Sequence, residues 1–212
     1  MGRTTGSARK AWKGATPSRD EQHRLKREAV VKAAARAFNR NGFHGTSLDQ
    51  IAKELNVTKA ALYYYIKNKG DILLECLRHA AAIGDAALDH GRNTGKTGRE
   101  KLMLALDRYV DDMTKDVGGL ALIGELKALP PKEQAAIIAA RDKFDHALRD
   151  ILQEGIRDGS IVPCDPKLAV FIMMGAINWL PRWFSPQGER TGSEIAAAFI
   201  ALFENGLAPR RR

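Results

Sequence analysis

Apolar positions recur at helical spacing along the chain from Gln22 onward. In the first segment they lie three and four residues apart: Val31, Ala34, Ala35 and Phe38. Asn41-Gly42 follows, and such a pair ends a helix because both residues tolerate the left-handed backbone of a closing turn. The pattern predicts a first helix from Gln22 to this pair.

Two short helices are predicted next. Ser47 occupies an N-cap position with Gln50 three residues on, the spacing of a capping box. The helix that follows ends near Asn56, and Thr58 is a suitable cap for another. Two short helices joined by a turn of about three residues form a helix-turn-helix.

Helical patterns continue to the end of the chain. Asn68 caps a fourth helix, with Asp71 in its first turn, that is predicted to run to about Leu88. Residues 90–98 are predicted to form a loop, and further helices are predicted over residues 100–117, 120–129, 131–158, 166–184 and 193–206. No segment alternates with a period of two over five residues, so the expected fold is all-α, with about nine helices.

Charge divides the 212 residues unequally. The chain carries a net charge of +9, but residues 1–69 hold 15 Lys and Arg against 5 Asp and Glu, whereas residues 70–212 hold 19 against 20. A basic region of this kind favours an anionic partner such as nucleic acid. We expect a disordered basic arm over residues 1–21, a helix-turn-helix domain over residues 22–68 and a second helical domain over residues 69–212.

Three classes of protein are disfavoured. The N-terminal region is basic and polar and lacks the apolar stretch of a secretory signal. The longest apolar stretch, residues 168–180, is shorter than the roughly 20 residues of a membrane-spanning helix. Cys76 and Cys164 are too few for a disulfide framework and lack C-x-x-C spacing. We therefore expect a cytoplasmic protein with reduced thiols.

The second helix of a helix-turn-helix lies in the major groove of DNA. Ala52 supplies the small residue needed where the two helices cross, and Asn56 tolerates the left-handed turn between them. The expected DNA-facing positions are Thr58, Lys59, Ala60, Tyr63, Tyr64 and Tyr65. Their side chains can contact phosphate oxygens and base edges. Buried aromatic residues are the alternative interpretation of the tyrosines, but three consecutive helical residues, about 100° apart, cannot all point inward.

Several motifs between Arg27 and Leu77 fit one pattern: Gly42-Phe43, Thr46-Ser47-Leu48, Ile51-Ala52, Val57-Thr58, Leu62-Tyr63-Tyr64-Tyr65-Ile66 and Lys67-Asn68-Lys69. This stretch resembles the DNA-binding domain of TetR-family transcriptional regulators. The resemblance implies a homodimeric bacterial regulator, usually a repressor, that binds a pseudo-palindromic operator. It also implies DNA contacts from Thr46, Ser47, Lys59, Ala60, Tyr63, Tyr64, Tyr65 and Lys69. Tyr65 stands where many members have histidine.

The same resemblance implies that residues 69–212 bind a ligand and form the dimer. The expected dimer interface lies on the last two long helices: Leu168, Ile172, Gly175, Trp179, Ile195, Phe199, Leu202 and Phe203. Gly175-Ala176 would permit close approach of two helices. An ordinary core within one chain is the alternative interpretation of these residues.

A pocket for a hydrophobic effector is expected in this second domain, lined by apolar groups with a few polar ones. The candidates are His79, Tyr109, Met113, Phe144, Met174 and Asn178, each of which could instead be a core residue. Residues 178–184, which read NWLPRWF, are similar to family members that respond to fatty-acid or acyl-coenzyme A derivatives. We expect such an effector to change the spacing of the two recognition helices and so to release the operator.

No enzyme, metal or cofactor is expected. Residues 91–97, which read GRNTGKT, have three residues between the glycines where a phosphate-binding P-loop has four, and no apolar strand precedes them. Asp107 and Asp111 share a helix face, but Lys115 makes Asp111 half of an ordinary surface pair. Two alternatives stay open: a DNA-binding regulator without a small-molecule effector, and a nucleotide-dependent enzyme that uses residues 91–97.

Overall fold

The computed structural model describes residues 18–115, 121–185 and 187–207. These residues form eight α-helices, two short 3-10 helices and no strand, which confirms the all-α prediction. The α-helices are α1 (Arg19–Gly45), α2 (Leu48–Glu54), α3 (Lys59–Tyr63), α4 (Lys69–Thr94), α5 (Gly98–Lys115), α6 (Pro131–Arg157), α7 (Pro166–Asn178) and α8 (Gly192–Leu207). The 3-10 helices are Ala121–Ala128 and Leu180–Arg182.

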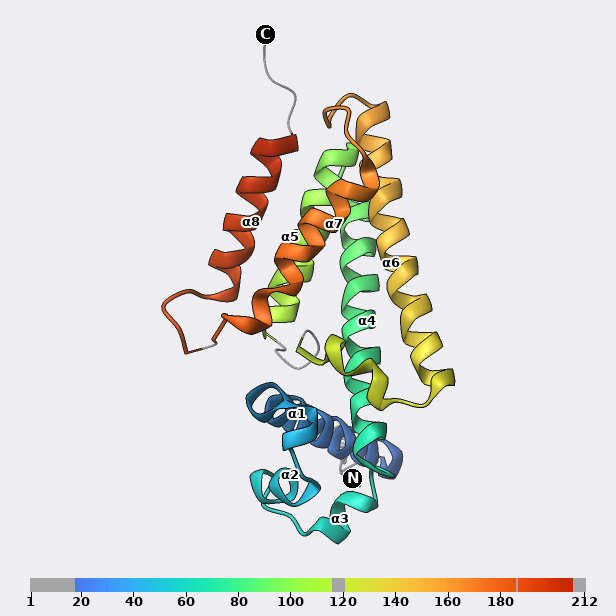
Figure 1. Cartoon of the computed structure of the whole chain (residues 1–212), viewed down its shortest axis with the longest axis vertical. Coiled ribbons are helices and arrows are strands. Elements are labelled where there is room, and N and C mark those ends of the chain that lie inside the picture. The colour runs from blue at the N-terminus through green and yellow to red at the C-terminus, as the bar shows by residue number, and fades with distance from the viewer. Residues whose placement is uncertain (1–17, 116–120, 186, 208–212) are drawn as a thin grey trace, which may run out of the picture.

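The helices are arranged in two groups joined by one long helix. Figure 1 shows α1, α2 and α3 together at one end, while α4 rises from them into a bundle with α5, α6, α7 and α8. Each group has its own apolar core, around Phe38, Ile51 and Leu62 in the first and around Leu106, Leu148 and Leu152 in the second. Since α4 contributes buried residues to both cores, it connects the two groups mechanically.

The predicted helix starts of the first group are confirmed by their caps. The Ser47 hydroxyl accepts a hydrogen bond from the Gln50 amide at 3.2 Å, and the Gln50 side chain accepts one from the Ser47 amide at 2.7 Å. Thr58 and Asn68 cap α3 and α4 through their side-chain oxygens. Asn56 has a φ of 54°, the left-handed turn conformation expected of it.

The predicted loop over residues 90–98 is wrong in its first half, because α4 continues to Thr94. Gly91 is buried at the contact with α5, where a Cβ atom would lie 2.3 Å from the Lys101 carbonyl oxygen. The glycine therefore serves close helix packing and not a turn. The nucleotide-binding interpretation of residues 91–97 loses its basis, since the first four of these residues are helical.

Other element boundaries also differ from the predictions. Helix α1 begins at Arg19, capped by the Ser18 hydroxyl, so residues 19–21 belong to the helix and not to a disordered arm. Residues 1–17 of the predicted arm lie outside the described residues. Helix α7 ends at Asn178, ahead of Pro181, which has no amide hydrogen to continue it. The predicted helix over residues 120–129 is a 3-10 helix that stops before Pro130, and its first residue lies outside the described part.

None of the helices in the described part of the chain combines the length and the apolar character that spanning a membrane requires.

Candidate DNA-binding surface and effector cavity

The side chains of α3 that are predicted to face DNA lie together on the surface. Tyr63 is 52% exposed and Tyr64 is 63% exposed, whereas Leu62 between α3 and the core is 1% exposed. Thr58, Lys59 and Ala60 are exposed on the preceding turn. For Tyr63 and Tyr64 the interpretation as core aromatics is therefore wrong. The helix presents two phenols and an ammonium group to solvent on one short surface.

Lys59 is held in place by α2. Its ammonium nitrogen lies 2.8 Å from the Asp49 carboxylate, and this hydrogen bond raises the pKa of Lys59. The two residues border a shallow groove between α2 and α3 that also includes Lys53, Asn56 and Thr58. The groove therefore carries the charged side chains Lys53, Lys59 and Asp49 at the edge of the helix-turn-helix.

The structure corrects the role expected of Thr46. Its side chain is buried, and its hydroxyl donates to the carbonyl oxygens of Ala37 at 3.1 Å and Gly42 at 2.9 Å. The hydroxyl therefore closes the C-terminal turn of α1 and is not presented to a phosphate. Ser47, the next residue, is exposed at the N-terminus of α2, where a phosphate could approach it.

Lys69 has an internal role that its sequence position does not indicate. Its ammonium nitrogen donates to the carbonyl oxygens of Phe43 at 2.8 Å and Thr46 at 2.9 Å, and lies 4.4 Å from the centre of the Phe43 ring. Lys69 thus fastens the start of α4 to the end of α1. One of its three ammonium hydrogens has no such acceptor, so the predicted phosphate contact stays a prediction.

Tyr65 is half-buried and lies at the junction of three helices. Its ring packs 5.1 Å from that of His23 on α1, and its carbonyl oxygen accepts a hydrogen bond from Arg27. Arg27 also donates to Asp71 on α4 at 3.3 Å and forms an ion pair with Glu75 at 3.3 Å. Burial alone would raise the pKa of Asp71, but hydrogen bonds from the Lys67 amide and from Arg27 outweigh it and lower that pKa. We call this group, Arg27 with Tyr65, Asp71 and Glu75, the Arg27 clasp.

A cavity of about 560 Å³ lies in the second group of helices, between α4, α6 and α7, and we call it the effector cavity. Four of the six predicted ligand-binding residues line it: Tyr109, Phe144, Met174 and Asn178. Met113 is buried in the core of the bundle, and His79 lines another cavity, between α1 and α4. The volume is within the range of small-molecule sites, which is about 300–1,000 Å³.

Polar atoms without partners mark the effector cavity. The side-chain oxygen of Asn178 and the Nε atom of Arg149 are buried, and neither has a hydrogen-bond partner among the described residues. Burying such atoms unpaired costs free energy, so a polar group that reached them would be stabilised by a hydrogen bond. Burial raises the pKa of Tyr109 to about 12, which keeps its hydroxyl neutral in the same wall.

The outer face of α7 is apolar and uncovered. Among the predicted interface residues, Leu168, Ile172, Trp179 and Leu202 are between 58% and 70% exposed, and nothing lies within 4 Å of a Cβ atom placed on Gly175. Phe171 and Trp183 are half exposed and extend the exposed set, and Phe171 and Gly175 also line the effector cavity. We call these residues of α7, the turn that follows it and α8 the α7–α8 face. Ile195 is buried in the bundle core, and Phe199 and Phe203 pack against that core, so these three do not belong to the exposed set.

Comparison with known proteins identifies the family. The pattern of the family described as "Bacterial regulatory proteins, tetR family" matches residues 30–76, and that of "Tetracyclin repressor-like, C-terminal domain" matches residues 95–207. The chain belongs to the TetR family. It is therefore a DNA-binding transcriptional regulator. The first match runs from within α1 to the start of α4, and the second covers α5 to α8.

Three relatives illustrate the extent of the similarity. The "Fatty acid metabolism regulator protein" of Bacillus subtilis (strain 168) is 26% identical over 74% of this chain and 82% of its own. The TetR-family regulator PfmR from Thermus thermophilus superposes with a TM-score of 0.72, at 28% identity over 86% of this chain and 99% of its own. AibR in complex with isovaleryl coenzyme A and operator DNA superposes with a TM-score of 0.70, at 25% identity over 84% and 97%.

Two residues of the arrangements described above, Arg27 and Arg149, have no signal in the sequence. Arg27 lies 38 residues from Tyr65 and 44 residues from Asp71, and an arginine on a polar helix face gives no indication of such partners. Arg149 lies one helical turn after Asp145, its ion-pair partner, and so looks like half of a surface pair. Only the fold places it in the wall of a cavity.

Proposed function

We propose that this protein is a cytoplasmic homodimeric repressor that binds a pseudo-palindromic operator and releases it when an acyl-coenzyme A enters the effector cavity. The DNA contacts come from Ser47, Thr58, Lys59, Ala60, Tyr63 and Tyr64, with Tyr65 and Lys69 beside them. The observation that carries the proposal is that the same α4 helix begins in the DNA-binding group and lines the effector cavity through residues 77–84.

The α7–α8 face is the dimer interface of this proposal. Large exposed apolar side chains on α7 and α8, with an unobstructed glycine on α7, fit the packing of these helices from two chains into a four-helix interface. A dimer places two copies of α3 in successive major grooves, about one helical turn of DNA apart. Because α7 also forms a wall of the effector cavity, a ligand there contacts a helix of the interface.

The chemistry of the cavity agrees with an acyl thioester. Its walls are mainly apolar, with the two unpartnered atoms described above. The Arg149 Nε–H group would donate to a carbonyl oxygen of the acyl-pantetheine segment, and the Asn178 oxygen would accept from an amide N–H of the same segment. AibR, with isovaleryl coenzyme A, and the regulator of fatty acid metabolism support this class of effector.

The test is an operator-binding titration by fluorescence anisotropy with and without octanoyl-coenzyme A. We expect the acyl-coenzyme A to weaken operator binding, and Asn178→Ala to require about tenfold more of it because one hydrogen bond to a buried group is lost. Coenzyme A without an acyl chain is the matched ligand control. Operator binding that no acyl-coenzyme A changes would contradict the effector proposal and favour a regulator controlled without a small molecule.

A further inference from the structure

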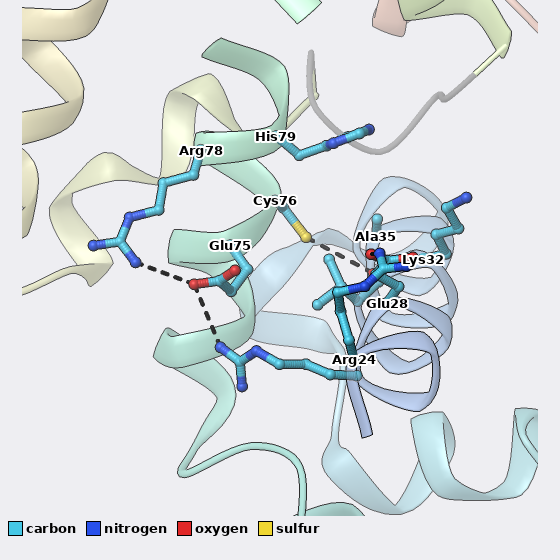
Figure 2. Close-up of a pocket in the computed structure, with 10 residues that line it drawn as sticks. Arg24, Glu28, Lys32, Ala35, Glu75, Cys76, Arg78 and His79 are labelled. Atoms are coloured by element: carbon cyan, nitrogen blue, oxygen red, sulfur yellow. Dashed lines mark hydrogen bonds and ion pairs between the residues drawn. The ribbon is translucent and has the colours of Figure 1, made fainter. Parts of the chain in front are cut away.

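A second cavity, of about 530 Å³, lies between α1 and the first half of α4, and we call it the hinge cavity (Figure 2). It has no lining residue in common with the effector cavity. Its apolar part is formed by Val31, Ala35 and Cys76, and Ala35 and Cys76 are buried. It lies beside the Arg27 clasp, so its walls belong both to the DNA-binding group and to the helix that leaves it.

The walls of the hinge cavity are rich in charged side chains, and its arginines are balanced by carboxylates in and beside the wall, including Glu21 and Asp71. Four cationic side chains and two carboxylates line it: Arg24, Arg27, Lys32 and Arg78, against Glu28 and Glu75. The carboxylates are already shared among the arginines. Glu28 pairs with Arg24, and Glu75 pairs with both Arg27 and Arg78, at 3.3 Å and 3.1 Å.

Lys32 is the cation in this wall that the described structure leaves without an acceptor. Its side chain is exposed, and no hydrogen bond or ion pair joins it to any other described residue. In Figure 2 it extends from the α1 side of the cavity, while Arg78 and His79 extend from the α4 side. The cavity thus combines an apolar floor with an available cation at its rim.

We propose that the hinge cavity binds an amphipathic organic anion, with its carboxylate at Lys32 and its alkyl chain against Val31, Ala35 and Cys76. An inorganic anion would leave the apolar floor uncovered, and a neutral hydrocarbon would leave Lys32 without a partner. A ligand with a carboxylate and an alkyl chain would pair with Lys32 and also cover the apolar floor. Such a ligand would contact both α1 and α4. It would be distinct from the ligand of the effector cavity.

The experiment is a calorimetric titration of the full chain with decanoate, below its critical micelle concentration. Lys32→Gln should weaken decanoate binding about fivefold, the effect expected for one partly exposed charged contact. Lys26→Gln is the matched control, since Lys26 is an exposed lysine of the same helix that does not line the cavity. Acetate should bind far more weakly than decanoate, because it has no chain for the apolar floor.

Amide chemical shifts locate the binding. We expect the largest decanoate-dependent shifts at Lys32, Ala35 and His79. Four results would overturn the proposal: no saturable binding, equal affinity in the two lysine variants, acetate binding as tightly as decanoate, or shifts concentrated at Phe144 and Asn178. The first three results leave the octanoyl-coenzyme A titration unaffected, and the fourth would place the alkyl chain in the effector cavity instead, so failure of this proposal is distinguishable from failure of the effector proposal.

Discussion

Replacing Arg27 with methionine should destabilise the protein far more than the same change at Arg36, another arginine of α1. Arg27 donates to the Tyr65 carbonyl and to Asp71 and pairs with Glu75, and its side chain is 28% exposed. Arg36 is 55% exposed and makes one contact, to Glu54 at 3.4 Å. Methionine keeps most of the aliphatic length in both cases, so the comparison isolates the guanidinium contacts.

The magnitude follows from burial. A hydrogen bond to a charged group contributes about 1.5–3 kcal/mol when it is shielded from solvent, and an exposed ion pair about 0.2–1 kcal/mol. The partly exposed Arg27 clasp falls between these limits, and we expect Arg27→Met to cost about 2 kcal/mol. In a chain of this size each kcal/mol lowers Tm by about 2–4 °C, so Tm should fall by about 4–8 °C. The exposed Arg36 pair, at 3.4 Å, should contribute about 0.5 kcal/mol or less, so Arg36→Met should change Tm by about 2 °C or less.

Thermal unfolding followed by circular dichroism, at one protein concentration and neutral pH, measures both variants. The pKa of Asp71 is lowered in the folded state, so its contribution is present above its ordinary value of 3.8 and is lost as pH falls through the lower folded-state pKa. The difference between wild type and Arg27→Met should therefore shrink in acid. Equal losses of Tm in the two variants, or a difference that does not decrease at low pH, would refute the reasoning about the clasp.

Three further predictions concern other surfaces. Lys59→Gln should weaken operator binding and reduce the slope of log affinity against log salt by about one, whereas Lys143→Gln on α6 should leave that slope unchanged. Gly91→Ala should lower the free energy of unfolding in urea by about 3 kcal/mol, since its Cβ would overlap a carbonyl of α5. The control Gly206→Ala has open space around its Cβ and should lower it by less than about 0.5 kcal/mol. Ile172→Glu should convert the proposed dimer to monomer in sedimentation velocity, and an unchanged dimer would exclude the α7–α8 face as its interface.

The features of the fold that sequence predicts well are local. Ser47, Thr58 and Asn68 each cap the amide three residues further on, so each carries its signal within one turn of helix. Gly91 shows where local reasoning fails. A glycine is used both to end a helix and to let two helices approach, and only the position of α5 distinguishes these uses.

The residues of the candidate sites also divide into those that local sequence predicts and those that it does not. The exposed tyrosines of α3 follow from helix geometry, because consecutive residues cannot all face the core. The burial of the Thr46 hydroxyl does not follow, because a threonine before an N-cap serine looks like a surface residue. Its two acceptors belong to the last turns of α1, and the chain brings them together only through the left-handed turn at Gly42, whose φ is 73°.

Helix α4 is the element through which ligand and DNA can influence each other. At its start, Lys69 and Asp71 hold it to α1 and to the α3–α4 junction, and at its other end Gly91 packs directly against α5. Between these anchors it lines first the hinge cavity and then the effector cavity. A ligand in either cavity that displaces α4 must therefore move the α1–α3 group relative to the bundle or break one of the anchors. Since the anchors use charged hydrogen bonds and close packing, we expect movement of the DNA-binding group to be the less costly response.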